Sequence, residues 1–270
     1  MKNGMRVLYY NYCTCIEFSL PRLVYNHNGH LIQDQNDIDQ GFKKMWKLLK
    51  DDLDFEDLYG IKFTRIDLCA HFPYSVDKLT RLFLYRLPKG STKGILKKQP
   101  KYKSYSRFEY SKMALKIYDK PNQIKSLTWL RSSKIEFQIN NLKLSKYFSP
   151  QSLKRMPLDF NECWDVYRDI LASYEITKIK TNKRKTKVDH VFDAIRKANP
   201  KFKQKKLNVV LNSHSSHVRR TVKGKVAEQI SREIGLCPQD LINNMSLEPA
   251  LKVSLPKGKL FAKVSRLRFE

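Results

Sequence analysis

The sequence is poor in acidic residues and in cysteine, and it has no long apolar run. Among 270 residues there are 26 Asp and Glu against 53 Lys and Arg, which gives a formal charge of +27. No apolar run could span a bilayer and no signal peptide is recognisable, so neither a membrane-spanning nor a secreted protein is expected. Five cysteines, an odd number, favour reduced thiols and a cytoplasmic location over a disulfide framework.

Cysteine and histidine also give no convincing metal site. Cys13 and Cys15 form a lone C-x-C pair, whereas a zinc–thiolate site needs further ligands. His214 and His217 lie three residues apart on an expected helix, and we interpret them as surface residues. Neither pair predicts a metal centre.

The excess of positive charge points to a polyanionic partner, and nucleic acid is the one we expect. An anionic membrane surface is the alternative, but no long basic amphipathic helix stands out. The hydrophobic content of 41% is typical of a globular chain. A chain of this length suits one domain with a smaller second one.

Four stretches alternate apolar and polar residues with a period of two, as strands with one buried face do. They are Met5–Leu20, Ile61–Phe72, Met113–Lys120 and Lys134–Asn140. Apolar residues at helical spacing follow the first two stretches and recur from Asp159. We therefore predict an α+β fold, in which a central antiparallel sheet has helices on one face and an open polar face on the other.

The last third of the chain differs in composition. Residues 177–270 hold 23 Lys and Arg against 7 Asp and Glu, and the clearest helix there spans Thr221–Ile234. We predict two domains: residues 1–176 contain the sheet, and residues 177–270 form a small, basic, mostly helical DNA-binding domain.

Tyr118 lies on the polar face of its predicted strand, with Lys116 and Lys120 two residues away on either side. An unperturbed phenol, with a pKa of about 10, is protonated at neutral pH, but cationic neighbours favour the phenolate. The pattern predicts a catalytic group in which Tyr118 is the nucleophile and the two lysines lower its pKa and neutralise developing charge. The alternative is a cross-strand tyrosine beside solvated lysines.

Carboxylates occupy the polar faces of the other strands. We predict that Asp67 and Glu136 share a face with Tyr118, and that Glu17 lies on the polar face of the first strand. Carboxylate oxygens are hard ligands that suit Mg²⁺ or Mn²⁺, so these three residues are candidate metal ligands.

Basic residues elsewhere are candidates for contacts with DNA phosphates. Residues 89–104 hold six lysines, two glycines and a proline, which predicts a flexible basic loop beside the tyrosine strand. A solvated hairpin is the alternative for this loop. The candidate nucleic-acid-binding residues are Lys93, Lys97, Lys98, Lys101, Lys103, Arg65, Lys134, Lys183, Arg184, Lys185, Arg219 and Arg220.

Four short blocks, in order, are similar to those of a known family. They read I-E-F-S-L-P (16–21), T-R-I-D-L (64–68), L-K-I-Y-D-K (115–120) and K-I-E-F-Q-I (134–139). Together they resemble the replication initiators of filamentous phages and, more distantly, the initiators of rolling-circle plasmids. The resemblance covers roughly residues 9–148.

The resemblance implies an enzyme that nicks and joins one DNA strand at a replication origin. In that family the strand tyrosine followed two residues later by lysine is the nucleophile, which corresponds to Tyr118 and Lys120 here. The metal-dependent reaction would form a 5′-phosphotyrosine and free a 3′ hydroxyl that primes a polymerase. The implied partners are single-stranded or extruded origin DNA and a host helicase and polymerase, in the cytoplasm of a bacterial host cell, with no membrane partner.

This chain departs from the family's pattern at two positions. Lys134 stands where an arginine is frequent, and Gln123 stands where an acidic residue is common. A ligand or base at position 123 is therefore not expected. The His-hydrophobic-His motif that other rolling-circle nucleases use to hold a metal is also missing.

Two other functions fit the composition. One is a non-catalytic DNA-binding protein whose polar sheet face binds phosphates, and the other is an RNA-binding protein. An exposed ladder of stacking aromatic residues would favour RNA. The predicted face carries carboxylates instead, which would repel phosphate in the absence of a metal, so we favour the enzyme.

Overall fold

The computed structural model describes most of the chain. The residues described are 5–11, 13–27, 31–49, 62–88, 95–98, 104–119, 133–154, 157–174, 186–246 and 261–269.

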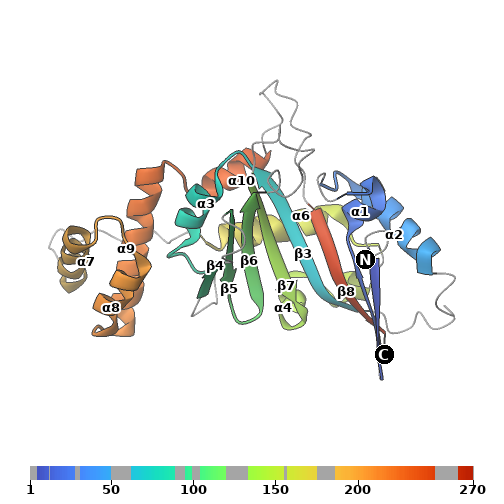
Figure 1. The fold of residues 1–270 in the computed structure, drawn as a ribbon, viewed down its shortest axis with the longest axis horizontal. Helices are drawn as coiled ribbons and strands as arrows, with labels where there is room; N and C mark the ends of the chain where they lie inside the picture. The colour runs from blue at the N-terminus through green and yellow to red at the C-terminus, as the bar shows by residue number, and fades with distance from the viewer. Residues whose placement is uncertain are drawn as a thin grey trace.

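A single sheet of eight strands organises the molecule (Figure 1). Its order is β1-β2-β8-β3-β7-β6-β5-β4, and every pair of neighbours is antiparallel. The strands are β1 (Met5–Tyr10), β2 (Cys13–Phe18), β3 (Lys62–Phe72), β4 (Ile95–Lys98), β5 (Tyr105–Glu109), β6 (Met113–Asp119), β7 (Ser133–Asn140) and β8 (Phe261–Phe269).

The register decides which side chains share a face, because residues directly opposite in an antiparallel pair point to the same side. Lys116 lies opposite Glu136, and Tyr118 lies opposite Lys134. Asp67 lies opposite Gln138 in the next strand. The polar residues of β3, β6 and β7 are therefore collected on one face of the sheet.

Helices cover the other face, which is apolar. In Figure 1, α6 (Phe160–Ala172) runs behind the strands, and its Tyr167 packs on Phe137 of β7 with ring centroids 5.0 Å apart. Asp159 begins this helix by accepting a hydrogen bond from the backbone N–H of Glu162. The other helices of this part are α1 (Leu20–Tyr25), α2 (Gln35–Leu49), α3 (Val76–Phe83), α4 (Asn141–Tyr147) and α5 (Pro150–Lys154).

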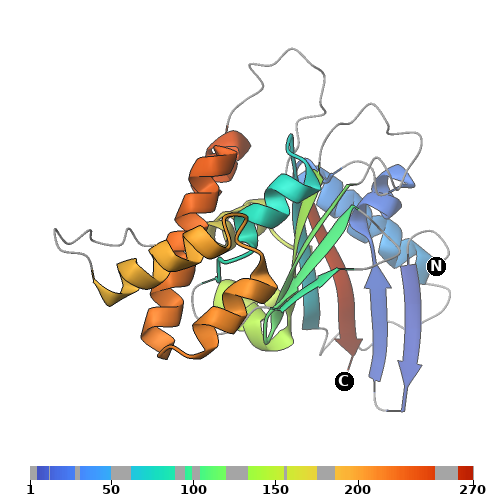
Figure 2. The ribbon, with the colours of Figure 1, turned by 60° about the vertical axis from the view of Figure 1, so that its left-hand side comes forward.

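A second group of helices lies beside the β4 end of the sheet (Figure 2). It comprises α7 (Lys187–Ala198), α8 (Gln204–Asn212) and α9 (Ser216–Ile234), which enclose a core of their own. The main residues of this core are Ile195, Phe202, Leu207, Leu211, Val222, Val226 and Ile230.

The chain then returns from this helical group to the sheet. Helix α10 (Pro238–Ser246) contributes Leu241 and Ile242 to the main core, and β8 pairs with both β2 and β3. The predicted boundary after residue 176 therefore does not divide the sheet from the rest, because β8 belongs to the sheet.

The fold class is confirmed: the protein is α+β, with an antiparallel sheet and helices packed on it. The expectation of an open polar face is wrong at the centre of that face. Asp67, Lys116, Tyr118 and Glu136 are each at most 9% exposed. Within the described part of the chain, no helix is both long and apolar enough to cross a membrane.

Candidate active site

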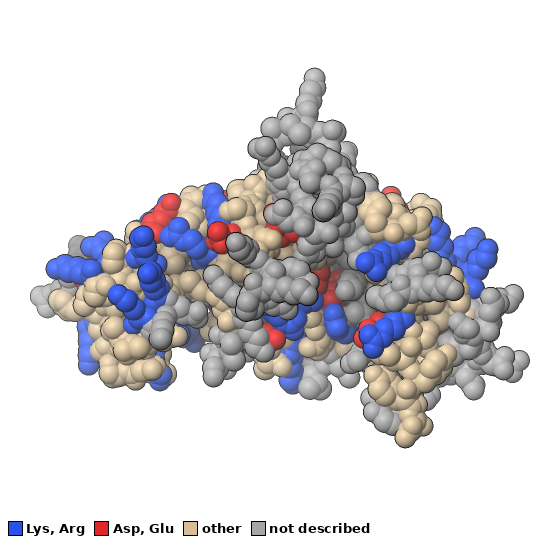
Figure 3. Space-filling model, in the orientation of Figure 1, with Lys and Arg blue, Asp and Glu red and all other residues tan. Residues whose placement is uncertain are grey.

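Three neighbouring strands bring a tyrosine, two carboxylates and several cations together on the polar face. The alternation of β6 directs Lys116 and Tyr118 to this side, while Leu115 and Ile117 point to the core. In Figure 3, acidic and basic atoms lie side by side over the middle of the sheet. Sequence reasoning correctly placed Tyr118, Asp67 and Glu136 on one face.

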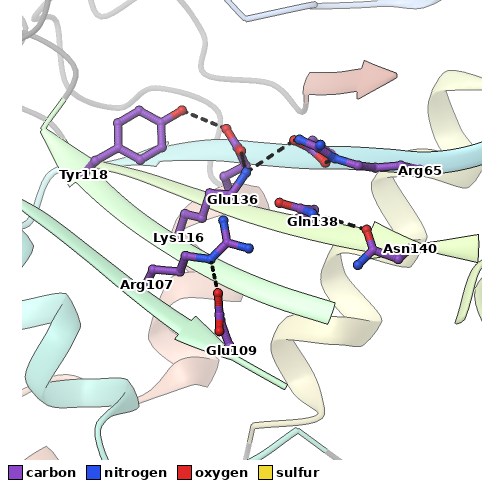
Figure 4. A network of polar contacts seen from close by, with 9 residues as sticks. Arg65, Arg107, Glu109, Lys116, Tyr118, Glu136, Gln138 and Asn140 are labelled. Atoms are coloured by element: carbon purple, nitrogen blue, oxygen red, sulfur yellow. Dashed lines mark hydrogen bonds and ion pairs between the residues drawn. The ribbon is translucent and has the colours of Figure 1, made fainter. Parts of the chain in front are cut away.

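Glu136 links the tyrosine to a lysine (Figure 4). The Tyr118 hydroxyl donates a hydrogen bond of 2.8 Å to Glu136 Oε2. The Lys116 Nζ donates to the other oxygen, Oε1, at 2.6 Å. A proton acceptor therefore touches the candidate nucleophile and is itself held in place by a third group, an arrangement typical of activated nucleophiles.

Asp67 continues the same network. Arg65 binds it with two parallel hydrogen bonds, from Nε to Oδ1 at 2.8 Å and from a terminal nitrogen to Oδ2 at 2.7 Å. Lys116 Nζ lies 3.4 Å from Asp67 Oδ2, so one ammonium group contacts both carboxylates. Bidentate contacts with arginine fix the orientation of a carboxylate as well as its charge. Asp67, which is fully buried, is therefore a rigid part of the site.

The environment keeps the phenol protonated. Burial, followed by the charge of Glu136, raises the pKa of Tyr118 well above its ordinary value. Burial alone would lower the pKa of Lys116, but the charges of Glu136 and Asp67 together outweigh it and raise that pKa. The expected lowering of the phenol's pKa is wrong, because burial and Glu136 raise it, and the Lys116 ammonium contacts the carboxylates and not the phenol.

Two further residues flank the ring of Tyr118. Tyr105 of β5 stacks on it, with ring centroids 6.2 Å apart and an interplanar angle of 27°. The Lys134 ammonium lies over the same ring at 5.9 Å from its centroid. The sequence pattern predicts no role for Tyr105, although the alternation of Tyr105, Arg107 and Glu109 indicates a strand with these residues on one face.

The candidate metal ligands divide into a pair and an outlier. Asp67 and Glu136 converge on the Lys116 ammonium, so their oxygens face a position already occupied by a cation. Glu17 belongs to β2, and β8 separates β2 from β3. Burial opposes a raised pKa for Arg65, but Asp67 and Glu136 raise it, and the charge of Glu17 adds a smaller contribution. Among the described residues, no group of three or more His, Cys, Asp or Glu is placed to hold a metal ion.

The predicted nucleic-acid contacts are only partly described. Arg65 and Lys134 belong to the network above, where Lys134 is buried. Arg219 and Arg220 are exposed on α9. Lys97 and Lys98 lie on β4, but their side chains are not described. Lys93, Lys101, Lys103, Lys120, Lys183, Arg184 and Lys185 lie outside the described residues.

The site thus combines a hydrogen-bonded tyrosine and carboxylate with three cations around two acidic groups. The cations are Arg65, Lys116 and Lys134, and they would favour an anionic substrate such as a phosphodiester. Comparisons of the chain with protein-family models, with curated proteins and with solved structures find no match.

Proposed function

We propose that the protein nicks and rejoins one strand of DNA through a covalent phosphotyrosine, as an initiator of rolling-circle replication. The observation that carries the proposal is the hydrogen bond from Tyr118 to Glu136, whose other oxygen is held by Lys116. The cations supply a setting for a phosphodiester, and the tyrosine supplies a nucleophile that can form a stable covalent link.

In the proposed reaction Glu136 acts as general base. It accepts the phenolic proton while the Tyr118 oxygen attacks the phosphorus atom of the scissile phosphodiester. A bond forms between the tyrosine oxygen and phosphorus, and the bond between phosphorus and the 3′ oxygen breaks. The departing 3′ oxygen receives a proton, so the products are a 5′-phosphotyrosine and a free 3′ hydroxyl. Reversal of these steps joins a strand without an external energy source.

The cations have separate tasks in this proposal. Lys116 holds Glu136 in position and places positive charge beside the reacting phosphate. Arg65 holds Asp67, which in turn positions Lys116. Because the Tyr118 side chain is only 8% exposed, the proposal requires that DNA binding exposes its hydroxyl.

Mg²⁺ or Mn²⁺ belongs to the same proposal, with Asp67 and Glu136 as its ligands. The Lys116 ammonium occupies the position between these two carboxylates, so a small divalent ion bound there would have to displace it. Proteins commonly bind such an ion through one or two carboxylates plus substrate phosphate. When bound, such an ion would polarise the phosphate as a Lewis acid. Excess chelator should then prevent formation of the covalent product, and an undiminished product would overturn the metal assignment.

The sequence resemblance supports the biological setting. Its last three blocks fall on the neighbouring strands β3, β6 and β7, which carry the site. We propose single-stranded or extruded origin DNA as substrate, with a host helicase and polymerase acting on the nicked origin in the cytoplasm of a bacterial cell.

The test compares Tyr118→Phe with Tyr105→Phe, its stacked neighbour on β5. Each protein is incubated with Mn²⁺ and randomised single-stranded oligonucleotides labelled at the 3′ end, and the products are separated on a denaturing gel. Wild type and Tyr105→Phe should give a retarded band that protease removes. Tyr118→Phe should give none, because the nucleophilic oxygen is gone. A retarded band that persists in Tyr118→Phe, or that wild type fails to form, would contradict the proposal.

A nucleic-acid-binding protein without catalysis is the second candidate. If binding uncovers Tyr118, its ring and the stacked Tyr105 ring, with Lys134 beside them, would form a platform for an unpaired base. In that case both Phe variants should bind single strands with the affinity of wild type. Neither wild type nor either variant should form a covalent product.

A further inference from the structure

Helices α8 and α9 are joined by only three residues. Ser213, His214 and Ser215 lie between them, and Ser215 begins α9 by accepting a hydrogen bond from the backbone N–H of Val218. A connection of three or four residues between two packed helices is typical of the helix-turn-helix motif. The third helix, α7, packs on α9. The group therefore has the three packed helices and the short turn of a helix-turn-helix unit.

Basic residues far outnumber acidic residues in this unit. Between Asp193 and Glu228 the sequence has ten Lys and Arg and no Asp or Glu. Of the acidic residues around this stretch, Asp193 pairs with Arg196 at 3.9 Å, Asp189 pairs with Lys225, and Glu233 pairs with Arg81. No carboxylate within this stretch can neutralise its cations.

The first half of α9 presents a basic face to solvent. Arg219 and Arg220 are exposed and Lys223 is half-buried, whereas Val222 and Val226 point into the core of the unit. Spacings of three and four residues bring Lys223 alongside both arginines. In the described part of the chain none of these three cations forms an ion pair, and burial together with the nearby Arg219 charge lowers the pKa of Lys223. An anion at this face would relieve the repulsion.

The unit is fixed to the sheet by buried contacts. The Tyr85 hydroxyl donates to the Phe202 carbonyl, inside the core of the unit. Arg86 donates to the Tyr174 carbonyl at 3.1 Å and to the Ser231 hydroxyl at 2.8 Å. Because these contacts tie α9 to the region beside α3, DNA bound on α9 would lie at a defined distance from the sheet.

We propose that α8 and α9 form a helix-turn-helix that inserts the first half of α9 into the major groove of duplex DNA. The groove is about 12 Å wide and admits an α-helix. Arginine side chains there can bind guanine O6 and N7 as well as phosphates, and the first residues of the second helix make such contacts in known helix-turn-helix proteins. The inference goes beyond the nicking proposal, because duplex binding by α9 does not depend on Tyr118.

The test measures binding of the full chain to a fluorescent duplex of random sequence and to one of its single strands. The variant is Arg219→Ala with Arg220→Ala, and the matched control is Arg232→Ala, an exposed arginine in the last turn of α9. The double variant should bind the duplex about tenfold more weakly and lower the slope of log affinity against log salt by about two. The control should change both quantities much less, and circular dichroism should show that all three proteins are folded.

A second measurement reports the groove. Dimethyl sulfate methylates guanine N7, which lies in the major groove. Wild type should therefore bind a premethylated duplex more weakly than an unmodified one. The double variant should bind the two duplexes with similar affinity. Equal losses of duplex affinity in the double variant and the control would overturn the proposal. The positive charge would then contribute wherever it lies on α9, and not through the face formed by Arg219 and Arg220. Equal affinity for methylated and unmodified duplex, or a loss confined to the single strand, would also overturn it.

Discussion

Two lysines from different regions show how the same side chain serves different purposes. Lys116, on the sheet, lies between Glu136 and Asp67, and their charges raise its pKa. Lys223, on α9, has Arg219 for a neighbour, and burial and that positive charge lower its pKa. In the sheet, cations and carboxylates are paired and buried. On the first half of α9, Arg219, Arg220 and Lys223 form no ion pair within the described part of the chain, so this face suits a polyanion from outside.

In our two proposals, the sheet handles the proton and α9 binds the nucleic acid electrostatically. A buried, paired network can hold a base at a fixed distance from a nucleophile. The exposed arginines of α9 attract phosphates at long range, but a guanidinium cannot accept a proton at neutral pH. The predictions below challenge this division, beginning with the largest expected effect.

Glu136→Gln should have the largest effect on chemistry. The amide keeps the shape of the side chain but cannot accept the phenolic proton, so the rate of adduct formation should fall by about 10²–10⁴-fold. Glu109→Gln is the matched control, because Glu109 pairs with Arg107 at the rim of the same face. The measurement is single-turnover formation of the protease-sensitive band. Similar rates for the two variants would remove Glu136 from the mechanism.

Asp67→Ala should destabilise the fold far more than Glu233→Ala. Without Asp67, the guanidinium of Arg65 and the ammonium of Lys116 lose a buried carboxylate, which typically costs about 3–5 kcal/mol in the free energy of unfolding. Glu233 pairs with Arg81 near the surface, where such a pair contributes at most about 1 kcal/mol. Urea unfolding of both variants measures the difference, and equal losses would show that the sheet network is not the stronger one.

The pH dependence of stability should have opposite signs in the two regions. Tyr118 has a raised pKa in the native state, so its contribution is complete below the unfolded value of about 10 and is lost as the pH rises above it. Lys223 has a lowered pKa, so the unfolded chain binds more protons and its contribution grows as the pH rises toward the ordinary lysine value.

Unfolding free energies of wild type, Tyr118→Phe and Lys223→Met, measured between pH 8 and 11, separate these effects. Tyr118→Phe should weaken the loss of stability above pH ~10, by at most about 1.4 kcal/mol for each pH unit. Lys223→Met should steepen the overall decline, since it removes a contribution of the opposite sign. If the unfolding free energies of all three proteins depend on pH in the same way, the pKa shifts assigned to Tyr118 and Lys223 are both wrong.

The sequence predicted which residues share the polar face, and the reason is local. Strand alternation alone determines that Tyr118 and Lys116 point one way and Leu115 the other. It determines nothing about register between strands, and register decides the partners. Because Lys116 lies opposite Glu136, its ammonium reaches a carboxylate and not the phenol. Burial, followed by the charge of Glu136, then raises the pKa of the phenol that we expected to be lowered.

Non-local pairing explains what else was missed. Strand β8 comes from the far end of the chain and lies between β2 and β3, so Glu17 is separated from Asp67. Tyr105 stacks on Tyr118 only because β5 pairs with β6 in one particular register. Burial of the polar face likewise depends on tertiary packing. A period of two distinguishes the faces of a strand but does not say how much of each face meets solvent.

The central claim is that Tyr118 becomes covalently joined to DNA. The most direct measurement digests the wild-type protein–DNA product with protease and nuclease and locates the modified residue by mass spectrometry. We predict a nucleotide 5′-phosphate on the peptide that contains Tyr118, and on no other tyrosine. A phosphodiester to Tyr105, Tyr110 or another residue would contradict the assignment of the nucleophile, and a product without any covalent nucleotide would contradict the proposed enzyme.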